Sequence, residues 1–495
     1  MKKITEKTCK KQNKEKKLLI FSIILIYFTL FFEKKQVICY NNFMLAKISP
    51  SLKRLASKFD KPLYIVGGYV RGMLIDGVPS HDVDLAGPIT SGEFLRALSE
   101  TGFTVRAESP RTHTVMFTDD NGAKYEFTSF RKEVYPEGGG HSPEFTEFTE
   151  DIREDALRRD FKCNAVYYDI KNGEIVDPLK GVWDIKYKIL DTVKEPAKVF
   201  ESDGLRLLRL ARFSAELDFT PTEDVIKAAT LYADNIKDIS GERIYDELCR
   251  MLVSDTRFPY SDKAGHYHSL KMCQKIGVLK YIFPEISLGE GLPQRKDFHK
   301  YDVLEHSFRA LLYSDPSVRL AALLHDVGKS VVYLRDGMYH FHTKEGVRVA
   351  RERLSALKAP KRVIEDTCWL ILWHMYDLKV DEPDHDVKRF IASNYEKIDR
   401  LLLLKEADIK ASSVDLVPLT VVRWKKLIAE MQQSLTPLAL KELAVDGEDL
   451  EKLGLRGRLV GVTLKRLFEM TLDDPSLNKK ETLIEIVKNF EDDFA

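Results

Sequence analysis

Apolar and polar residues follow two different periodicities along this chain, and the change falls near Ala197. Upstream of it, short runs have the composition and alternation of β-strands, at Lys61–Val66, Asp82–Ala86, Thr114–Thr118 and Lys124–Thr128. The last two runs flank Asp119-Asp120-Asn121-Gly122, a strong hairpin turn. Helical spacing is found at Ser49–Phe59, with Ser49 as N-cap and Pro50 at the first helical position, and at Val70–Ile75 before Gly77.

Downstream of Ala197 the strand signal fades and helical spacing takes over. The pattern predicts helices at Val199–Leu217, Thr222–Asn235, Ser240–Leu252, Val303–Tyr313, Val318–Gly328, Thr343–Leu357, Val363–His374 and His385–Asn394, with several more to the end. We therefore expect an α+β protein. Its N-terminal head combines helices with a small mixed sheet, and a long all-α neck, body and tail follow.

The first 43 residues differ from the rest. They carry ten lysines and three glutamates, so the zero net charge of the chain hides a balance of −7 over residues 44–495. The apolar run Leu18–Phe32 would span roughly 22 Å as a helix, less than the ~30 Å hydrocarbon core of a membrane. A signal-peptide core and a membrane anchor are two interpretations. We favour a third, in which translation begins at Met44, and expect a cytoplasmic protein without a stable membrane partner.

Composition narrows the class of protein further. Hydrophobic content of 44% and charged content of 31% are typical of a soluble globular protein, and 495 residues suffice for three or four domains. Six cysteines without a CxxC pair favour a reducing compartment and argue against a disulfide framework. Since the body of the chain is not basic, a nucleic acid would have to bind at local basic patches.

A first group of chemically suggestive residues lies in the head. Gly67 and Gly68 stand between a strand and a helix, where backbone N–H groups can hold a phosphate, and Arg71 lies one turn further on. By itself, a Gly-Gly pair before a helix usually marks only a turn and not a phosphate-binding site. Asp82 and Asp84 alternate on a strand and share a face, which is the usual arrangement for holding metal ions on a phosphate. Glu126, between two aromatic residues, is the candidate third carboxylate, although a solvated glutamate fits the pattern equally well.

Four motifs in order give these residues a context. They are Gly-Gly-Tyr-Val-Arg-Gly at 67–72, Asp-Val-Asp-Leu-Ala at 82–86, Arg-Arg-Asp-Phe-Lys-Cys-Asn-Ala at 158–165, and Asp203-Gly-Leu-Arg206-Leu-Leu-Arg209-Leu-Ala-Arg212-Phe213. From about residue 45 to the C-terminus the chain resembles the family of class II CCA-adding tRNA nucleotidyltransferases and bacterial poly(A) polymerases, of the type that carries an HD domain. Three positions depart from the family pattern: Gly72 replaces Asp, Lys162 replaces Thr, and Ser202 replaces Glu.

The resemblance implies a reaction and a role for each motif. The 3′-OH of tRNA attacks the α-phosphate of CTP or ATP, with two Mg²⁺ ions at Asp82 and Asp84 and assistance from Glu126. The residues implied in nucleotide binding are Gly67, Gly68, Arg71, Arg158, Arg159, Asp160, Asn164, Asp203, Arg206, Arg209 and Arg212. Among these, Asp203 and Arg206 would read the base edge in place of a nucleic-acid template. The Gly138–Gly140 segment, within the loop Pro136–Pro143, matches the family's mobile loop.

The neck helix and the C-terminal half add two further expectations. Arg206, Arg209 and Arg212 lie on one side of a mostly apolar helix, and buried arginines need partners. A second metal site is indicated by the doublet His325-Asp326 after an apolar helix, which resembles the HD phosphohydrolase superfamily. That resemblance implies His306, His325, Asp326 and Asp408 as ligands of a transition metal or Mg²⁺, supported by His342 and His374. The tail arginines Arg456, Arg458 and Arg466, with Lys465, are candidate RNA contacts, or a solvated helix face.

These expectations divide the chain into a leader (1–43), a nucleotidyltransferase head (44–190), a helical neck and RNA-binding region (191–298), an HD domain (299–412) and a tail (413–495). The leading hypothesis is CCA addition to tRNA. Enzymes that add only CC or only A to tRNA, and enzymes that polyadenylate general RNA, contain all of these motifs. Both activities are therefore alternatives. A further hypothesis is that the protein is a hydrolase and not a nucleotidyltransferase. In that case the HD domain is the active enzyme and the head is an inactive RNA-binding remnant. The sequence leaves the oligomeric state open.

Overall fold

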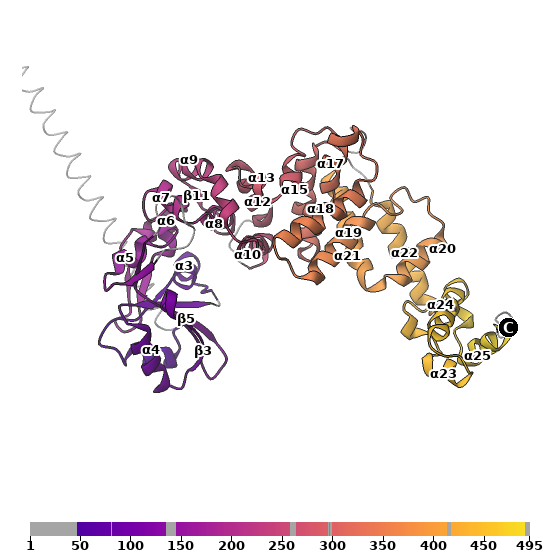
Figure 1. The fold of residues 1–495 in the computed structure, drawn as a ribbon, viewed down its shortest axis with the longest axis horizontal. Helices are drawn as coiled ribbons and strands as arrows, with labels where there is room; N and C mark the ends of the chain where they lie inside the picture. The colour runs from indigo at the N-terminus through magenta and orange to yellow at the C-terminus, as the bar shows by residue number, and fades with distance from the viewer. Residues whose placement is uncertain are drawn as a thin grey trace, which may run out of the picture. The chain divides into compact units, whose positions relative to one another are not determined.

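The computed structural model describes residues 47–80, 82–134, 145–257, 264–295, 297, 299–412 and 417–490. The expectations for residues 1–43 and for the loop Pro136–Pro143 lie outside the described residues. The chain divides into two compact units, Met1–Ile239 and Ser240–Ala495 (Figure 1). This boundary falls inside the predicted neck region 191–298, and the finer division into five parts stays a prediction.

A seven-stranded mixed sheet forms the framework of the first unit. Its order is β3-β4-β5-β2-β1-β8-β9. These strands are β1 (Tyr64–Val66), β2 (Val83–Gly87), β3 (Thr104–Ser109), β4 (Thr114–Thr118), β5 (Lys124–Ser129), β8 (Tyr167–Asp169) and β9 (Glu174–Val176). Two small pairs accompany it, β6 (Arg131–Val134) with β7 (Phe145–Phe148), and β10 (Ile189–Leu190) with β11 (Thr220–Pro221). Within the large sheet β2 and β5 run parallel, and every other neighbouring pair is antiparallel.

Helices pack on this sheet and extend the first unit. They are α2 (Pro50–Ala56), α3 (Gly68–Ile75), α4 (Ser91–Ser99), α5 (Ile152–Leu157), α6 (Gly181–Tyr187), α7 (Pro196–Ser202), α8 (Leu205–Glu216) and α9 (Glu223–Leu231), with short 3₁₀ turns at Pro110–Thr112, Lys162–Asn164 and Ala233–Asp238. Helix α3 packs on β1 and β2, and α4 packs on β3 and β4. The ring of Phe94 in α4 stacks on Phe127 of β5 with 3.7 Å between centroids, which anchors α4 to the sheet.

Two local predictions for this unit are confirmed in detail. The Ser49 side chain accepts from the backbone N–H of Leu52, as an N-cap does, with Pro50 at the first helical position. The β4–β5 turn places Gly122 at φ +80° and holds the Asn121 N–H on the Asp119 carboxylate. The mixed-sheet head predicted from the strand pattern is therefore present.

The predicted single helix Val199–Leu217 is wrong, because the chain breaks at Asp203 and Gly204. Asp203 is extended and accepts the N–H of Leu205, which ends α7 and starts α8. A Cβ on Gly204 would lie 2.4 Å from the Asn235 carbonyl oxygen, so the chain passes too close there for any side chain. Apolar spacing continues through the break, which is why the periodicity did not reveal it.

The second unit is helical throughout its described residues, as expected. Its helices are α10 (Gly241–Leu252), α11 (Ser254–Arg257), α12 (Gly265–Lys275), α13 (Leu279–Ile282), α14 (Pro284–Ser287), α15 (Val303–Tyr313), α16 (Arg319–Leu324), α17 (Val327–Asp336), α18 (His342–Ala356), α19 (Lys361–Trp373), α20 (Asp384–Ser393), α21 (Tyr395–Ala411), α22 (Leu419–Gln433), α23 (Gly447–Lys452), α24 (Arg458–Asp473) and α25 (Lys480–Phe490). Short 3₁₀ turns lie at Pro316–Val318, Leu440–Glu442 and Pro475–Leu477.

One helix prediction fails in this unit as well. The expected helix Val318–Gly328 is broken between Leu324 and Val327, at His325 and Asp326. A Cβ on Gly328 would lie 2.1 Å from the His342 carbonyl oxygen, so α17 starts in close contact with the first turn of α18. The apolar core of the unit includes Trp424, whose indole N–H donates to the buried Asp377 carboxylate at 2.8 Å. A membrane-spanning helix would need a longer apolar stretch than any helix in the described part of the chain offers.

Replacing Gly204 by Ala tests the close approach at the α7–α8 break. We expect a loss of about 1–3 kcal/mol in unfolding free energy, because the methyl group collides with backbone that cannot move away. Gly92→Ala is the matched control, since a Cβ there meets nothing within 4 Å, and it should stabilise α4 by about 0.5–1 kcal/mol. Denaturant unfolding measures both, and equal stability of the two variants would contradict the steric account.

Candidate functional site

Two carboxylates meet on the parallel strand pair of the head. The register of β2 and β5 places Asp84 beside Glu126 and Leu85 beside Phe127. Because alternate strand residues share a face, Glu126 lies opposite to the buried neighbours Tyr125 and Phe127, as predicted. Gly67, at φ +78°, approaches so closely that a Cβ there would lie 3.2 Å from an Asp84 carboxylate oxygen. The glycine turn and the carboxylates therefore belong to one site.

The surroundings of these two carboxylates disfavour their charged forms. The Asp84 side chain keeps access to solvent, but protein around it excludes much of the water, and this desolvation raises its pKa above the usual range. Its neighbour Asp82 also raises the pKa of Asp84, while Arg159 opposes the shift. Desolvation and the charge of Asp84 likewise raise the pKa of Glu126. A cation or a proton between the two carboxylates would relieve this repulsion.

Asp82 lies just before β2 and is exposed. Its predicted partnership with Asp84 is supported by their electrostatic interaction. However, the groups of three metal-ligand atoms that lie within 4.8 Å of one another, among the described residues, are all in the second unit. The assignment of Asp82 and Asp84 as metal ligands therefore stays a prediction.

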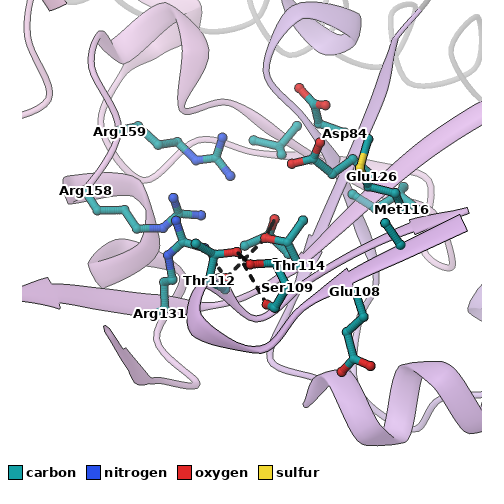
Figure 2. Close-up of a pocket in the computed structure, with 14 residues that line it drawn as sticks. Asp84, Glu108, Ser109, Thr112, Thr114, Met116, Glu126, Arg131, Arg158 and Arg159 are labelled. Carbon is teal, nitrogen blue, oxygen red and sulfur yellow. Dashed lines mark hydrogen bonds between the residues drawn. The ribbon is translucent and has the colours of Figure 1, made fainter. Parts of the chain in front are cut away.

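A cavity of about 410 Å³ opens beside the carboxylates (Figure 2). Asp84 and Glu126 lie on one side of it, and the guanidinium groups of Arg131, Arg158 and Arg159 face them from the other side. Its lining also includes Val66, Leu85, Ala107, Glu108, Ser109, Thr112, Thr114, Met116 and Thr128. Cations opposite carboxylates suit a ligand that brings both negative charge and a metal or hydroxyl group.

Buried acceptors hold two of these arginines in place. Asp155 is fully buried and accepts from the Nε of Arg158 at 2.7 Å and from Arg159 at 3.1 Å. The Tyr167 hydroxyl donates to Asp155 at 2.8 Å. Burial alone would raise the pKa of Asp155, but the two arginines and the tyrosine outweigh it and lower that pKa to about 2. Arg158 and Arg159 are thus oriented before any ligand arrives.

A second polar network joins the glycine turn to the neck helix. Arg71 of α3 is buried and donates to the Asn164 side-chain oxygen, and Asn164 donates to Asp160 at 2.9 Å. Asp160 also accepts from Arg209 of α8 at 2.7 Å, and its pKa lies well below the usual range because these contacts outweigh burial. The Phe213 ring stacks under Arg71, with 4.8 Å between guanidinium carbon and centroid. Arg71 consequently braces the site from inside rather than lining the cavity.

The remaining neck residues also have partners, as predicted for buried arginines. Arg206 donates to the Arg158 carbonyl at 2.7 Å and to the Ser202 hydroxyl at 3.0 Å. Arg212 donates to Glu216 at 2.9 Å. Ser202, which replaces a glutamate of the family pattern, therefore still contacts the arginine of its motif.

Close contacts with neighbouring atoms explain why glycine occupies positions 68 and 72. A Cβ on Gly68 would lie 3.3 Å from the Ser80 hydroxyl, and one on Gly72 would lie 2.4 Å from the Val78 carbonyl oxygen. The contact with Val78 explains why glycine replaces the aspartate of the family pattern at position 72. The backbone after α3 passes so close to Gly72 that an aspartate side chain does not fit.

The second unit contains a buried group of histidines and aspartates at the α16–α17 junction. Asp326 lies 3.2 Å from His325 Nε2, 3.4 Å from His306 Nε2, 3.5 Å from His342 Nε2 and 3.7 Å from His374 Nε2. Asp408 lies 2.9 Å from His306 Nε2. All six predicted residues of the HD site are therefore gathered at one place, although they come from six helices or their ends.

The hydrogen bonds around this group turn the Nε2 atoms of three histidines towards Asp326. The Nδ1 atoms of His325, His342 and His374 lie 2.7–3.0 Å from the carbonyls of Ala322, Tyr339 and Ile371, so each Nδ1 carries hydrogen and each Nε2 faces Asp326. The Nε2 atoms of His342 and His374 and one oxygen of Asp326 are buried without a hydrogen-bond partner, while the other Asp326 oxygen lies 2.7 Å from the Lys329 ammonium. Such orphaned acceptors fit a divalent cation.

The pKa values agree with ligand-competent histidines at two positions. Burial lowers the pKa of His342 to about 4 and also lowers that of His374, so both rings are neutral near pH 7. Burial would lower the pKa of His325 too, but Asp326 and Asp408 raise it to about 10. A cation bound there has to displace this proton.

Several residues of the two sites were not predicted. Asp155 precedes Arg158 and Arg159 by one helical turn, a spacing that signals an ion pair and could have revealed it. Lys329, 2.7 Å from Asp326, has the same i,i+3 signal. Arg131 and Tyr167 have no local signal, because only the sheet brings them to Arg158 and Arg159. His299 packs edge-on against His306, with 4.6 Å between ring centroids.

Comparisons with known families place three parts of the chain. Residues 63–191 match the family described as "Poly A polymerase head domain", and residues 303–411 match "HD domain". Residues 218–288 match "Probable RNA and SrmB- binding site of polymerase A". Each match covers a different region, and together they follow the order expected from the motifs.

Individual relatives support the same grouping. The A-adding tRNA nucleotidyltransferase of Deinococcus radiodurans is 32% identical over 66% of this chain and 76% of its own length. The CCA-adding enzyme of Streptococcus gordonii is 35% identical over 39% of this chain, and the match spans under half of that enzyme. A crystal structure of the Bacillus stearothermophilus CCA-adding enzyme with CTP has the same fold, with a TM-score of 0.61 at 23% identity, covering 90% of this chain and all of that one.

Replacing Asp155 by Asn tests the ion pairs that orient the cavity arginines. The folded-state pKa of about 2 is below the unfolded value, so Asp155 contributes stability above about pH 4 that is lost as pH falls towards 2. We expect the variant to lose about 3–5 kcal/mol near pH 7 and to show a smaller further loss on acidification. Unfolding measured at several pH values checks this, and an unchanged acid response would contradict the pairing.

The buried histidine group is expected to bind a divalent metal. Elemental analysis after incubation with Mn²⁺, Zn²⁺ or Ni²⁺ should find bound metal in the native protein, with a large loss in His374→Ala. His385→Ala, which removes an exposed histidine of α20, is the control and should retain the metal. Equal metal content in both variants would rule out the site.

Proposed function

The chain belongs to the family of tRNA nucleotidyltransferases and poly(A) polymerases, and on this premise we propose that its head adds CCA to the 3′ end of tRNA from CTP and ATP. One observation carries the proposal. Asp84 and Glu126 pair in register on parallel strands, beside the Gly67 turn and opposite the arginines of the cavity. This arrangement provides for a nucleophilic hydroxyl, a polyphosphate and cations within one site.

The reaction joins two substrates. The 3′-OH of the tRNA attacks the α-phosphorus of the nucleoside triphosphate, a new phosphodiester bond forms, and the bond to pyrophosphate breaks. Asp82 and Asp84 are the residues that would hold Mg²⁺, which when bound supplies compensating charge for the phosphates. Glu126 accepts the hydroxyl proton, a role that its raised pKa favours.

The phosphates are assigned to the glycine turn and the arginine pair. Gly67 and Gly68 present backbone N–H groups at the start of α3, where the helix dipole favours an anion. Arg158 and Arg159 supply positive charge from the opposite side of the cavity. Asp160 and Asn164 keep the neck in place against α3 through Arg209 and Arg71.

Base selection is assigned to Asp203 and Arg206. Asp203 lies at the break between α7 and α8, where its backbone leaves the helix and its carboxylate is partly exposed. Arg206 contacts the Arg158 carbonyl, which links base reading to phosphate binding. A carboxylate acceptor beside a guanidinium donor matches the edge of cytosine or adenine and disfavours guanine and uracil.

Addition of A alone is the second candidate. The observation in its favour is the Deinococcus radiodurans relative, an A-adding enzyme aligned over 76% of its length. The chemistry at Asp84 and Glu126 is the same for CC-adding, A-adding and poly(A)-adding enzymes. Only the nucleotide added and the RNA accepted distinguish them.

The second unit is proposed to be a metal-dependent phosphohydrolase. His306, His325, Asp326 and Asp408 would hold the divalent metal, with His342 and His374 as further ligands of a metal or the substrate phosphate. When bound, the metal supplies Lewis-acid activation for the hydrolysis of phosphomonoesters or phosphodiesters, including 2′,3′-cyclic ends. Lys329, already paired with Asp326, adds positive charge for a phosphate.

Supplying a tRNA that lacks its 3′ CCA, with labelled CTP and ATP separately and together, tests the proposal. Native protein should add C, C and then A. Asp84→Asn should lower incorporation by roughly 10³-fold, because several kcal/mol of charge stabilisation is lost. Asp120→Asn, in the exposed β4–β5 turn, should keep full activity.

Three results would change the conclusion. Addition of A only to a tRNA ending in CC would favour the second candidate. Untemplated A-tailing of any RNA would indicate a poly(A) polymerase. Equal incorporation by Asp84→Asn and native protein would remove the head from the chemistry altogether.

A further inference from the structure

The cavity beside the carboxylates has no ligand assigned to the part of its wall that Thr114, Thr128 and Arg131 form. Of the residues assigned to the incoming nucleotide, Arg158 and Arg159 line the cavity, whereas Gly67, Gly68, Asp203 and Arg206 do not. The cavity instead runs from Asp84 and Glu126 over the faces of β4 and β5. A volume of about 410 Å³ is within the range of ligand pockets.

A pair of hydroxyls follows the carboxylates along this wall. Thr128 is two residues from Glu126 on β5 and therefore shares its face, roughly 7 Å further along the strand. Thr114 of β4 pairs with Thr128 in the sheet register, and their Oγ1 atoms lie 3.2 Å apart. Both residues line the cavity. A hydroxyl pair both donates and accepts, which suits a sugar hydroxyl.

Arginine side chains also line this cavity. Arg131 donates to the Thr112 carbonyl and to Glu133 at 2.9 and 3.1 Å, which fixes its guanidinium at the cavity wall. Burial and the neighbouring Arg158 lower the pKa of Arg131. The Glu133 carboxylate lies 2.9 Å from Arg131 and 3.7 Å from Arg158, so two cations share one anion and positive charge is left for a phosphate. Figure 2 shows Arg131 and Arg158 close together, across the cavity from Asp84.

The order of groups orients a ligand. Carboxylates at one end repel a phosphate and accept from a hydroxyl, whereas the arginines at the other end attract a phosphate. We propose that this cavity binds the 3′-terminal nucleotide of the acceptor RNA, with its 3′-OH at Asp84 and Glu126, its 2′-OH at Thr114 and Thr128, and its phosphate at Arg131. The inference rests on the proposed nucleotidyl transfer and assigns the second substrate to a site of its own.

The 2′-OH contact gives the sharpest test, because it distinguishes RNA from DNA at one atom. Two acceptors that differ only in a ribose or 2′-deoxyribose at the 3′ end are compared with native protein and with the double variant Thr114→Val, Thr128→Val. Native protein should prefer the ribose end by roughly 3- to 10-fold in kcat/KM, the value of one lost hydrogen bond. In the double variant the preference should fall to about one while the KM for CTP stays unchanged.

Two further variants complete the design. Arg131→Gln should raise the KM for RNA roughly tenfold or more without raising that for CTP, because a charged contact to phosphate is lost. Thr104→Val, an exposed threonine of β3 outside the cavity, is the matched control and should keep the ribose preference. The unchanged KM for CTP verifies that each variant has folded.

The outcomes separate this inference from the function on which it rests. Native activity with an undiminished ribose preference in the double variant would overturn the acceptor site alone. A rise in the KM for CTP in place of that for RNA would assign the cavity to the nucleotide and overturn it too. Failure of native protein to extend any RNA would overturn both proposals.

Discussion

The buried carboxylate of Asp160 is the interaction on which the geometry of the head depends. It accepts from Arg209 of the neck, from Asn164 and from the N–H of Phe161, and through Asn164 it reaches Arg71 of α3. An unpaired charge at this depth would cost several kcal/mol, so the partners must stay together for the head to fold. The glycine turn and the neck helix are consequently held in one fixed relation.

The acidic residues of the protein fall into two groups by how well they are satisfied. Asp155 and Asp160 are surrounded by donors, and the pKa values of both are lowered. Asp84 and Glu126 have raised pKa values, because the protein around them excludes water and their charges repel each other. The first group supports structure, whereas the second is where a cation or substrate gains the most from binding.

Sequence patterns predicted those features that depend on neighbouring residues. The N-cap at Ser49, the Asp119–Gly122 turn and the facing of Glu126 are all local, and each was found where expected. The breaks at Gly204 and at His325–Asp326 were missed because their cause is a close approach of distant backbone, which leaves apolar spacing intact. Arg131 reaches the cavity, and Tyr167 reaches Asp155 and Arg159, from strands far away in the sequence, and no spacing along the chain encodes these contacts.

The single parallel pairing in the head sheet has a kinetic consequence. Between β2 and β5 the chain forms α4, β3 and β4, so Asp84 and Glu126 become neighbours only after this long segment has closed. Closing a segment of this length costs conformational entropy before the contacts between β2 and β5 can compensate for it. Strand pairs that are far apart in the sequence therefore form late in folding. Partly folded chains with most of their secondary structure would therefore lack the paired carboxylates, which delays the appearance of the reactive centre until the rest of the head is in place.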